Sequence, residues 1–158
     1  MLVACAAIAA RYPMKIGTAI TVPYLRNPID LAGGFATLSE LTDGREVSLG
    51  LGAGEAMILG KHVRRWKPTS FVGETVRILK QLFAGQEVQT AEFPTLASYF
   101  HLQAESYKLR FPVQAPIRIY YGRGQTIGDR MLREVLTTCD GRPEGPRVGQ
   151  EGSCGWPP

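Results

Sequence analysis

The stretch KIGTAITVPYLRNPIDLAGGFATLSELTDGREVSLGLGAGE, residues 15–55, decides the fold. It begins at 15–22 with an apolar run rich in β-branched residues, which indicates a buried strand that Pro23 ends. Apolar residues then recur every three or four positions over 28–43, which predicts a helix with one apolar face. A second short strand is predicted at 46–52, so the stretch indicates a strand, a helix and a further strand.

Helices are also predicted on both sides of this stretch. Residues 2–12 are rich in helix formers, so we expect the end of a helix there. A helix with one apolar side is predicted at 70–84. We expect Thr69 or Ser70 to cap its N-terminus, with Glu74 close enough to assist.

The region after the second long helix is less regular. Residues 86–116 lack a clear period, with short hairpin strands expected around 99–102 and 107–111. A third buried strand is predicted at 117–121. Short apolar strands that alternate with amphipathic helices predict an α/β fold with a parallel sheet. This periodicity fits both a doubly wound sheet and a barrel.

The composition fits one folded domain. The 158 residues are 44% apolar and 20% charged, and the net charge of +4 comes from scattered basic residues, which argues against nucleic-acid binding. The apolar start, residues 1–10, is far shorter than the roughly 20 residues of a membrane span, so no membrane association is expected. A reducing cytoplasm and no zinc site or disulfide framework are expected from three cysteines without a C-x-x-C pair, Cys5, Cys139 and Cys154.

The character of the chain changes after the third predicted strand. Residues 129–138 have helical potential, whereas 140–158 contain five glycines and four prolines in 19 residues and no periodic apolar face. We therefore expect a folded domain at 1–124 and an irregular, disordered tail at 125–158.

Four motifs stand out along the chain. They are IGTAIT followed by VPYLRNP, a helix ending in ATLSELTDGR, the strand VSLGLGAGE, and KPTSFVGETVRILKQLFAGQEV. Together they resemble the luciferase-like monooxygenase family, which includes bacterial luciferase and deazaflavin-dependent methylenetetrahydromethanopterin reductases. The likeness continues through YFHLQAESYKLRFPVQAPIRIYYG and covers about residues 3–124.

The resemblance implies a TIM (β/α)8 barrel. The three predicted strands resemble the third, fourth and fifth strands of that barrel with their helices. Because a full barrel needs about 250 residues, we expect a partial barrel with open sheet edges. Such a fragment is expected to be marginally stable or to fold with a partner, as a homo- or hetero-oligomer. A reading-frame shift near Arg123 would explain the change in composition.

In barrels of this kind the active site lies at the C-terminal ends of the strands. The first such place here is the end of the strand at 15–22. There the resemblance implies a bulge, with a non-proline cis peptide, at Ala19 and Ile20 that supports the back of the cofactor ring, whereas the plainer interpretation is an ordinary strand end. The positions expected to contact the cofactor are Thr18, Ala19, Ile20 and Val22, with Pro23 and Tyr24 beside them.

Two further places follow the other predicted strands. Small residues that let a ring approach the backbone follow the second strand, at Gly52, Ala53 and Gly54. The resemblance gives Glu55 a catalytic role, substrate orientation or proton transfer, and the alternative is a solvated carboxylate. A turn whose N–H groups suit a cofactor phosphate follows the third strand, at Gly122, Arg123, Gly124 and Gln125.

The resemblance implies an oxidoreductase that uses flavin mononucleotide (FMN) or the deazaflavin coenzyme F-420. It would transfer hydride to or from a small organic substrate, or oxygenate it, and the cofactor would carry the chemistry. No metal site is expected, and His62 and His101 are expected to be surface or partly packed histidines rather than catalytic ones. Two alternatives are a catalytically inactive remnant of such an enzyme and a non-enzymatic interaction module.

Overall fold

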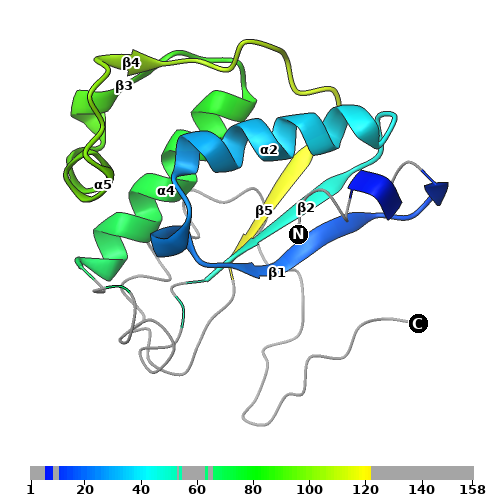
Figure 1. The fold of residues 1–158 in the computed structure, drawn as a ribbon, viewed down its shortest axis with the longest axis horizontal. Helices are drawn as coiled ribbons and strands as arrows, with labels where there is room; N and C mark the ends of the chain where they lie inside the picture. Colours follow the sequence, from blue (N-terminus) through cyan, green and yellow to red (C-terminus); the bar gives the residue numbers. More distant parts are fainter. Residues whose placement is uncertain (1–5, 9–10, 53, 55–62, 64–65, 122–158) are drawn as a thin grey trace, which may run out of the picture.

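The structure is a computed structural model, drawn in Figure 1. It describes residues 6–8, 11–52, 54, 63 and 66–121. Its central sheet is built from three parallel strands in the spatial order β1–β2–β5. The strands are β1 (Ile16–Thr21), β2 (Val47–Leu51) and β5 (Ile117–Tyr121). All three strands predicted from the apolar runs are therefore confirmed, with bounds that shift by one residue at most.

Two long helices connect the strands and cover the same face of the sheet (Figure 1). They are α2 (Pro28–Leu41) and α4 (Pro68–Phe83). The side chain of Asn27 caps α2 by accepting a hydrogen bond of 2.9 Å from the Ile29 N–H. The described strands advance in one direction and show none of the reversal of order that defines a doubly wound sheet. The α/β class with a parallel sheet is thus confirmed.

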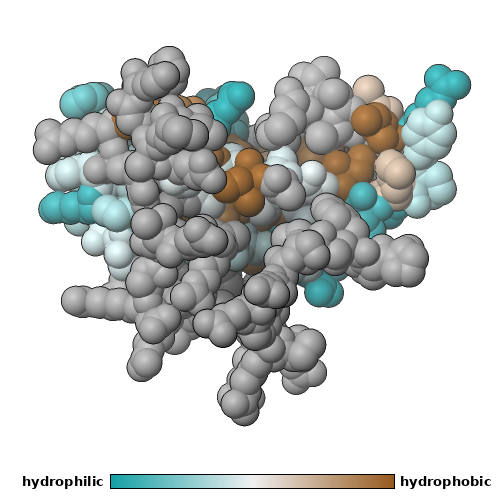
Figure 2. Space-filling model, turned by 90° about the horizontal axis from the view of Figure 1, so that it is seen from below, coloured by the Kyte–Doolittle hydropathy of each residue, from teal (hydrophilic) through white to brown (hydrophobic). Residues whose placement is uncertain are grey.

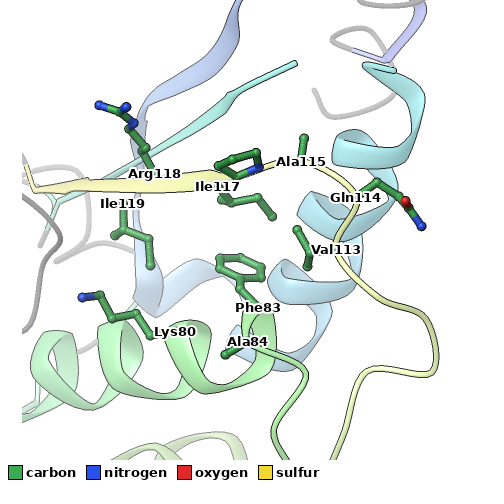
Figure 3. A pocket seen from close by; sticks show the side chains of 10 residues that line it. Lys80, Phe83, Ala84, Val113, Gln114, Ala115, Ile117, Arg118 and Ile119 are labelled. Carbon is green, nitrogen blue, oxygen red and sulfur yellow. The ribbon is translucent and has the colours of Figure 1, made fainter. Parts of the chain in front are cut away.

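The core lies between the sheet and these helices. Val47, Leu49 and Leu51 of β2 are fully buried, and each contributes about 1.5–3 kcal/mol to folding by leaving water. On β5, Ile117 and Ile119 point toward α4 while Arg118 points the other way (Figure 3). The remaining large, fully buried side chains come mainly from α2, α4 and the segment after α4. They include Phe35, Phe71, Leu79, Leu82, Phe93 and Leu96.

The N-terminus of α4 differs from the prediction. The helix begins at Pro68, and the residue before it, Lys67, has φ +43° and no side-chain cap. Thr69 and Ser70, predicted as caps, lie inside the helix because the fixed φ of Pro68 suits the first helical position. The predicted capping role of Glu74 at this terminus is also wrong, because its carboxylate binds another helix.

The region after α4 is more ordered than expected. Strands β3 (Val88–Gln89) and β4 (Ser106–Tyr107) form an antiparallel pair, and the helix α5 (Pro94–Phe100) lies between them in the sequence. The hairpin strand expected around 99–102 is therefore wrong, since helix α5 continues through Phe100 and a turn follows it. The strand expected around 107–111 is reduced to β4.

The ends of the chain are described only in part. Residues 6–8 and Arg11 are helical, which agrees with the predicted N-terminal helix. The tail expected at 125–158 and the helical potential at 129–138 lie outside the described residues. Within the described part of the chain, every helix falls short of the length and apolarity that crossing a bilayer requires.

One buried hydroxyl joins α2 to the start of β5. The Oγ of Ser39 accepts a hydrogen bond of 2.7 Å from the Ala115 N–H, and it donates one of 3.4 Å to the Ala115 carbonyl. Ser39 is fully buried, so both backbone groups depend on it for a partner. This contact spans 76 residues and fixes where β5 begins beside β2.

We expect Ser39→Ala to destabilise the protein by about 1–3 kcal/mol, because it leaves the buried amide of Ala115 without its partner. Urea unfolding followed by circular dichroism measures this change. The control is Thr37→Ala, whose exposed hydroxyl bonds its own helix, and a change within about 0.5 kcal/mol is expected there. Equal losses in the two variants would contradict the role given to Ser39.

Candidate functional site

The end of β1 contains a β-bulge. Thr18 pairs with Leu49 and Thr21 pairs with Leu51, so β1 advances by three residues where β2 advances by two. The extra residue falls within Ala19 and Ile20, the two positions at which a bulge was expected. A bulge bends its strand and redirects the side chains that follow. Here Thr18 and Thr21 are both buried on the helix side, whereas Ile20 is 47% exposed.

Hydrogen bonds fix this irregular backbone. The Gly52 N–H donates to the Thr21 carbonyl at 3.1 Å, just beyond the bulge. The hydroxyl of Thr21 donates to that of Thr18 at 3.0 Å, and Thr18 donates to the Gly50 carbonyl at 3.4 Å. The two threonines therefore satisfy each other inside the core and bind β1 to β2 at its C-terminal end.

The sheet face opposite the helices carries small residues next to one apolar side chain. A Cβ added to Gly52 would lie 2.2 Å from Cδ1 of Ile20, so Ile20 rests directly on the Gly52 backbone. Gly50 pairs with Tyr120, whose side chain is 51% exposed. Figure 2 views the molecule from below, away from α2, and hydrophobic surface (brown) is visible near the centre of this side.

The structure describes only some of the predicted site residues. The C-terminal ends of β1 and β2 bring together the bulge, Ile20, Val22 and Gly52, and Gly54 follows two positions after Gly52. Thr18 lies at the same end, but its side chain turns into the core. Gly54 has φ +73°, a conformation that glycine adopts readily. The predicted residues outside the described ranges are Ala53, Glu55, Gly122, Arg123, Gly124 and Gln125.

Tyr24, which follows the end of β1, is a core residue, the more common of the two roles that its sequence position allows. It lies in the short 3-10 helix η1 (Pro23–Leu25), which follows β1, and it is 3% exposed. Its ring stacks on Phe71 of α4, with centroids 4.1 Å apart. Its hydroxyl donates to the Trp66 carbonyl at 3.1 Å. The ring of Tyr24 therefore packs against α4 as part of the core.

Helix α5 completes an aromatic cluster around Tyr24. The Tyr99 ring meets Tyr24 edge to face at a centroid distance of 5.7 Å and meets Phe71 at 4.9 Å. Phe100 adds a further contact with Tyr99 at 4.9 Å. The hydroxyl of Tyr99 donates to the Tyr24 carbonyl at 3.3 Å. Burial raises the pKa of Tyr99 above its usual 10.0, so the phenol stays protonated and remains a donor at neutral pH.

Glu74 holds helix α5 in place. The carboxylate, on a residue only 5% exposed, accepts hydrogen bonds from the Thr95 and Leu96 N–H groups at 2.9 and 3.0 Å. These amides belong to the first turn of α5 and have no partner within the helix. A negative charge at this helix terminus is also favourable electrostatically.

A hollow of about 810 Å³ lies elsewhere, between the end of α4 and β5 (Figure 3). It is lined by Lys80, Phe83, Val113, Ile117 and Ile119, among others. These residues lie near the N-terminal end of the sheet, where Glu46 also pairs with Lys15 and Arg118 at 3.7 and 2.7 Å. Since sites in such folds occur at the opposite end, the bulge is the better candidate.

Sequence reasoning missed the residues that support the site from behind. Tyr99 lies in a segment that showed no regular period, and Glu74 was assigned to the wrong helix. The available signal was Pro94, which suits the first position of a helix and begins the run PTLASYF. That signal indicates a short helix, although not what the helix contacts.

The described part of this sheet end presents apolar surface. The exposed side chain of Ile20 offers an apolar contact and covers the Gly52 backbone. Gly54 has no side chain, which permits close approach to its backbone. Among the described residues, no three histidine, cysteine or acidic side chains gather as metal ligands would.

A family model and two similar proteins show what this chain resembles. The family model described as luciferase-like monooxygenase matches residues 1–142. A 5,10-methylenetetrahydromethanopterin reductase of Archaeoglobus fulgidus is 35% identical over 77 residues, which are 48% of this chain and 23% of that protein. The reductase of the same name from Methanolobus tindarius is 33% identical over 76 residues, with the same coverage. The match therefore spans less than a quarter of these relatives' length.

We expect Gly52→Ala to displace the Ile20 side chain, because the new Cβ occupies the place of Cδ1. An off-rotamer Ile20 would cost about 0.5–1.5 kcal/mol of stability, measured by chemical unfolding. Gly33→Ala is the control, because nothing lies within 4 Å of that Cβ in the helix, and it should be neutral or stabilising. The loss should shrink in Ile20→Ala/Gly52→Ala, and strict additivity of the two substitutions would contradict the contact.

Tyr99 should also make stability depend on alkaline pH. Its folded pKa is raised, so its contribution is complete below pH 10.0, where the unfolded phenol is still protonated, and falls as pH rises toward the folded pKa. The stability difference between wild type and Tyr99→Phe should therefore shrink as the pH rises through 10.0. Urea midpoints at each pH measure it, and a constant difference would argue against this titration.

Proposed function

The chain belongs to the luciferase-like monooxygenase family, and we propose that the C-terminal end of its sheet binds the ring of FMN or of the deazaflavin coenzyme F-420. The proposed activity is that of an oxidoreductase acting on a small organic substrate. The relatives named as methylenetetrahydromethanopterin reductases support an oxidoreductase.

The observation that carries this proposal is the bulge at Ala19 and Ile20 beside Gly52. A bulge is an expensive departure from regular pairing, and bulges are frequent next to active sites, where they redirect a side chain. Here the redirected side chain is Ile20, which leaves the core and lies against a residue without a side chain. Stability alone would favour an Ile20 buried like its neighbours.

The proposed roles of the chain's own residues follow from their positions. Ile20, which lies over the Gly52 backbone, supports one face of the ring by apolar contact, and Gly54 lets the ring lie close to the backbone. The hydrogen-bonded hydroxyls of Thr18 and Thr21 hold the backbone of the bulge, so Ile20 keeps its position under the ring. When bound, such a cofactor supplies hydride transfer, so the protein's main tasks are positioning and exclusion of water.

Other parts of the proposal rest on residues outside the described ranges. We propose Glu55 for orienting the substrate or moving a proton, since it follows Gly54 directly. Gly122, Arg123 and Gly124 follow β5 and are proposed to bind the cofactor phosphate. The sequential strand order, with both helices on one face, supports the further proposal that this sheet is a segment of a (β/α)8 barrel wall.

The test is a titration of the purified chain with FMN and, separately, with coenzyme F-420, followed by fluorescence. Saturable binding of one of them is expected. Ile20→Gln should weaken it about tenfold, because a polar side chain under the ring loses apolar contact and part of its hydration.

Leu41→Gln is the matched control. Leu41 is 45% exposed, much like Ile20, but it ends α2 at the other end of the sheet, so affinity should not change. Absence of binding of both cofactors to the wild type would overturn the proposal and favour a catalytically inactive remnant. Equal losses in the two variants would mean that the ring binds elsewhere.

A further inference from the structure

The turn η1 is mechanically linked to the bulge. Only Val22 separates the end of β1 from Pro23, and Val22 is held in an extended conformation, φ −93° and ψ 114°, as residues before proline usually are. Pro23 itself has a nearly fixed φ. A displacement of η1 therefore passes directly to Thr21 and the bulge, because the link between them has little freedom to absorb it.

The position of η1 is set by a residue 75 positions further along the chain. Tyr99 donates its hydroxyl hydrogen to the backbone carbonyl of Tyr24, the middle residue of η1. Ring contacts and the hydrogen bond from its own hydroxyl to the Trp66 carbonyl hold the side chain of Tyr24. The hydrogen bond from Tyr99 is directional and holds the main chain of the turn rather than its side chain.

Tyr99 is itself held on a fixed support. The carboxylate of Glu74 binds the first turn of α5, and Leu96 of the same helix is fully buried. The line of contacts therefore runs from α4 through α5 to η1 and ends at Ile20. Glu74 and Tyr24 are buried in this line, so they act on the bulge through their neighbours rather than by touching a ligand.

From this geometry we propose that Tyr99 is a positioning residue of the candidate site, whose hydroxyl fixes η1 and so keeps the bulge and Ile20 in place. This inference rests on the proposed function for its effect on cofactor binding. Its effect on the bulge does not depend on any ligand, which allows the two to be tested separately.

The experiment compares the full-length wild type, Tyr99→Phe and the control Tyr107→Phe. The control removes the hydroxyl of Tyr107, a half-buried tyrosine in β4 of the same segment between α4 and β5. The side chain of Tyr107 makes no hydrogen bond to the described residues. Amide hydrogen exchange is followed at Gly52, whose N–H bonds Thr21 beside the bulge, and at Leu49 in the middle of β2. Affinity for FMN and for coenzyme F-420 is measured on the same samples.

In Tyr99→Phe the Gly52 amide is expected to exchange about three- to tenfold faster while Leu49 is unchanged, and cofactor affinity should fall by a similar factor. Tyr107→Phe should match the wild type in both measurements. An unchanged Gly52 amide, or equal acceleration at Gly52 and Leu49, would overturn the inference, the latter because Tyr99 would then act only on global stability. If the wild type binds neither cofactor, the proposed function fails, and the exchange comparison still decides the role of Tyr99.

Discussion

Strand β2 pairs with β1 along one edge and with β5 along the other, and the rest of the structure depends on the register of these two pairings. All five of its residues are in register with β5, from Val47 opposite Ile117 to Leu51 opposite Tyr121. Its buried side chains face the helices, so a slip of one residue would turn them to the wrong side. Because the register of β2 is fixed on both edges, β1 accommodates the extra residue at the end of the sheet as a bulge.

The bulge decides which side chains enter the core. After it, Thr21 takes a position facing the helices, and the hydroxyls of Thr18 and Thr21 satisfy each other there. Ile20 moves to the opposite face and lies on Gly52. A buried polar pair and an exposed isoleucine reverse the usual distribution of these residue types. Both departures occur at the sheet end where α/β proteins bind ligands, as expected where function competes with stability.

The segment between α4 and β5, which contains helix α5, packs behind this end of the sheet and supports it. It brings Tyr99 and Phe100 against Tyr24 and Phe71, which come from two other elements. The buried carboxylate of Glu74 makes the excursion possible, because it supplies the partner that the first turn of α5 lacks. A seven-residue helix has little stability of its own, so its position depends on this contact and on its packing.

The sequence by itself determined the three strands, the two long helices and the strand end where a site was expected, because apolar periodicity and proline positions act locally. It also indicated the family through motifs within about residues 3–124. Only the tertiary structure decided that Tyr24 belongs to the core, that Glu74 binds α5 rather than capping its own helix, and that Tyr99 reaches η1. Those outcomes depend on contacts between residues 21 to 75 positions apart, and neither local propensity nor spacing specifies which distant groups will meet.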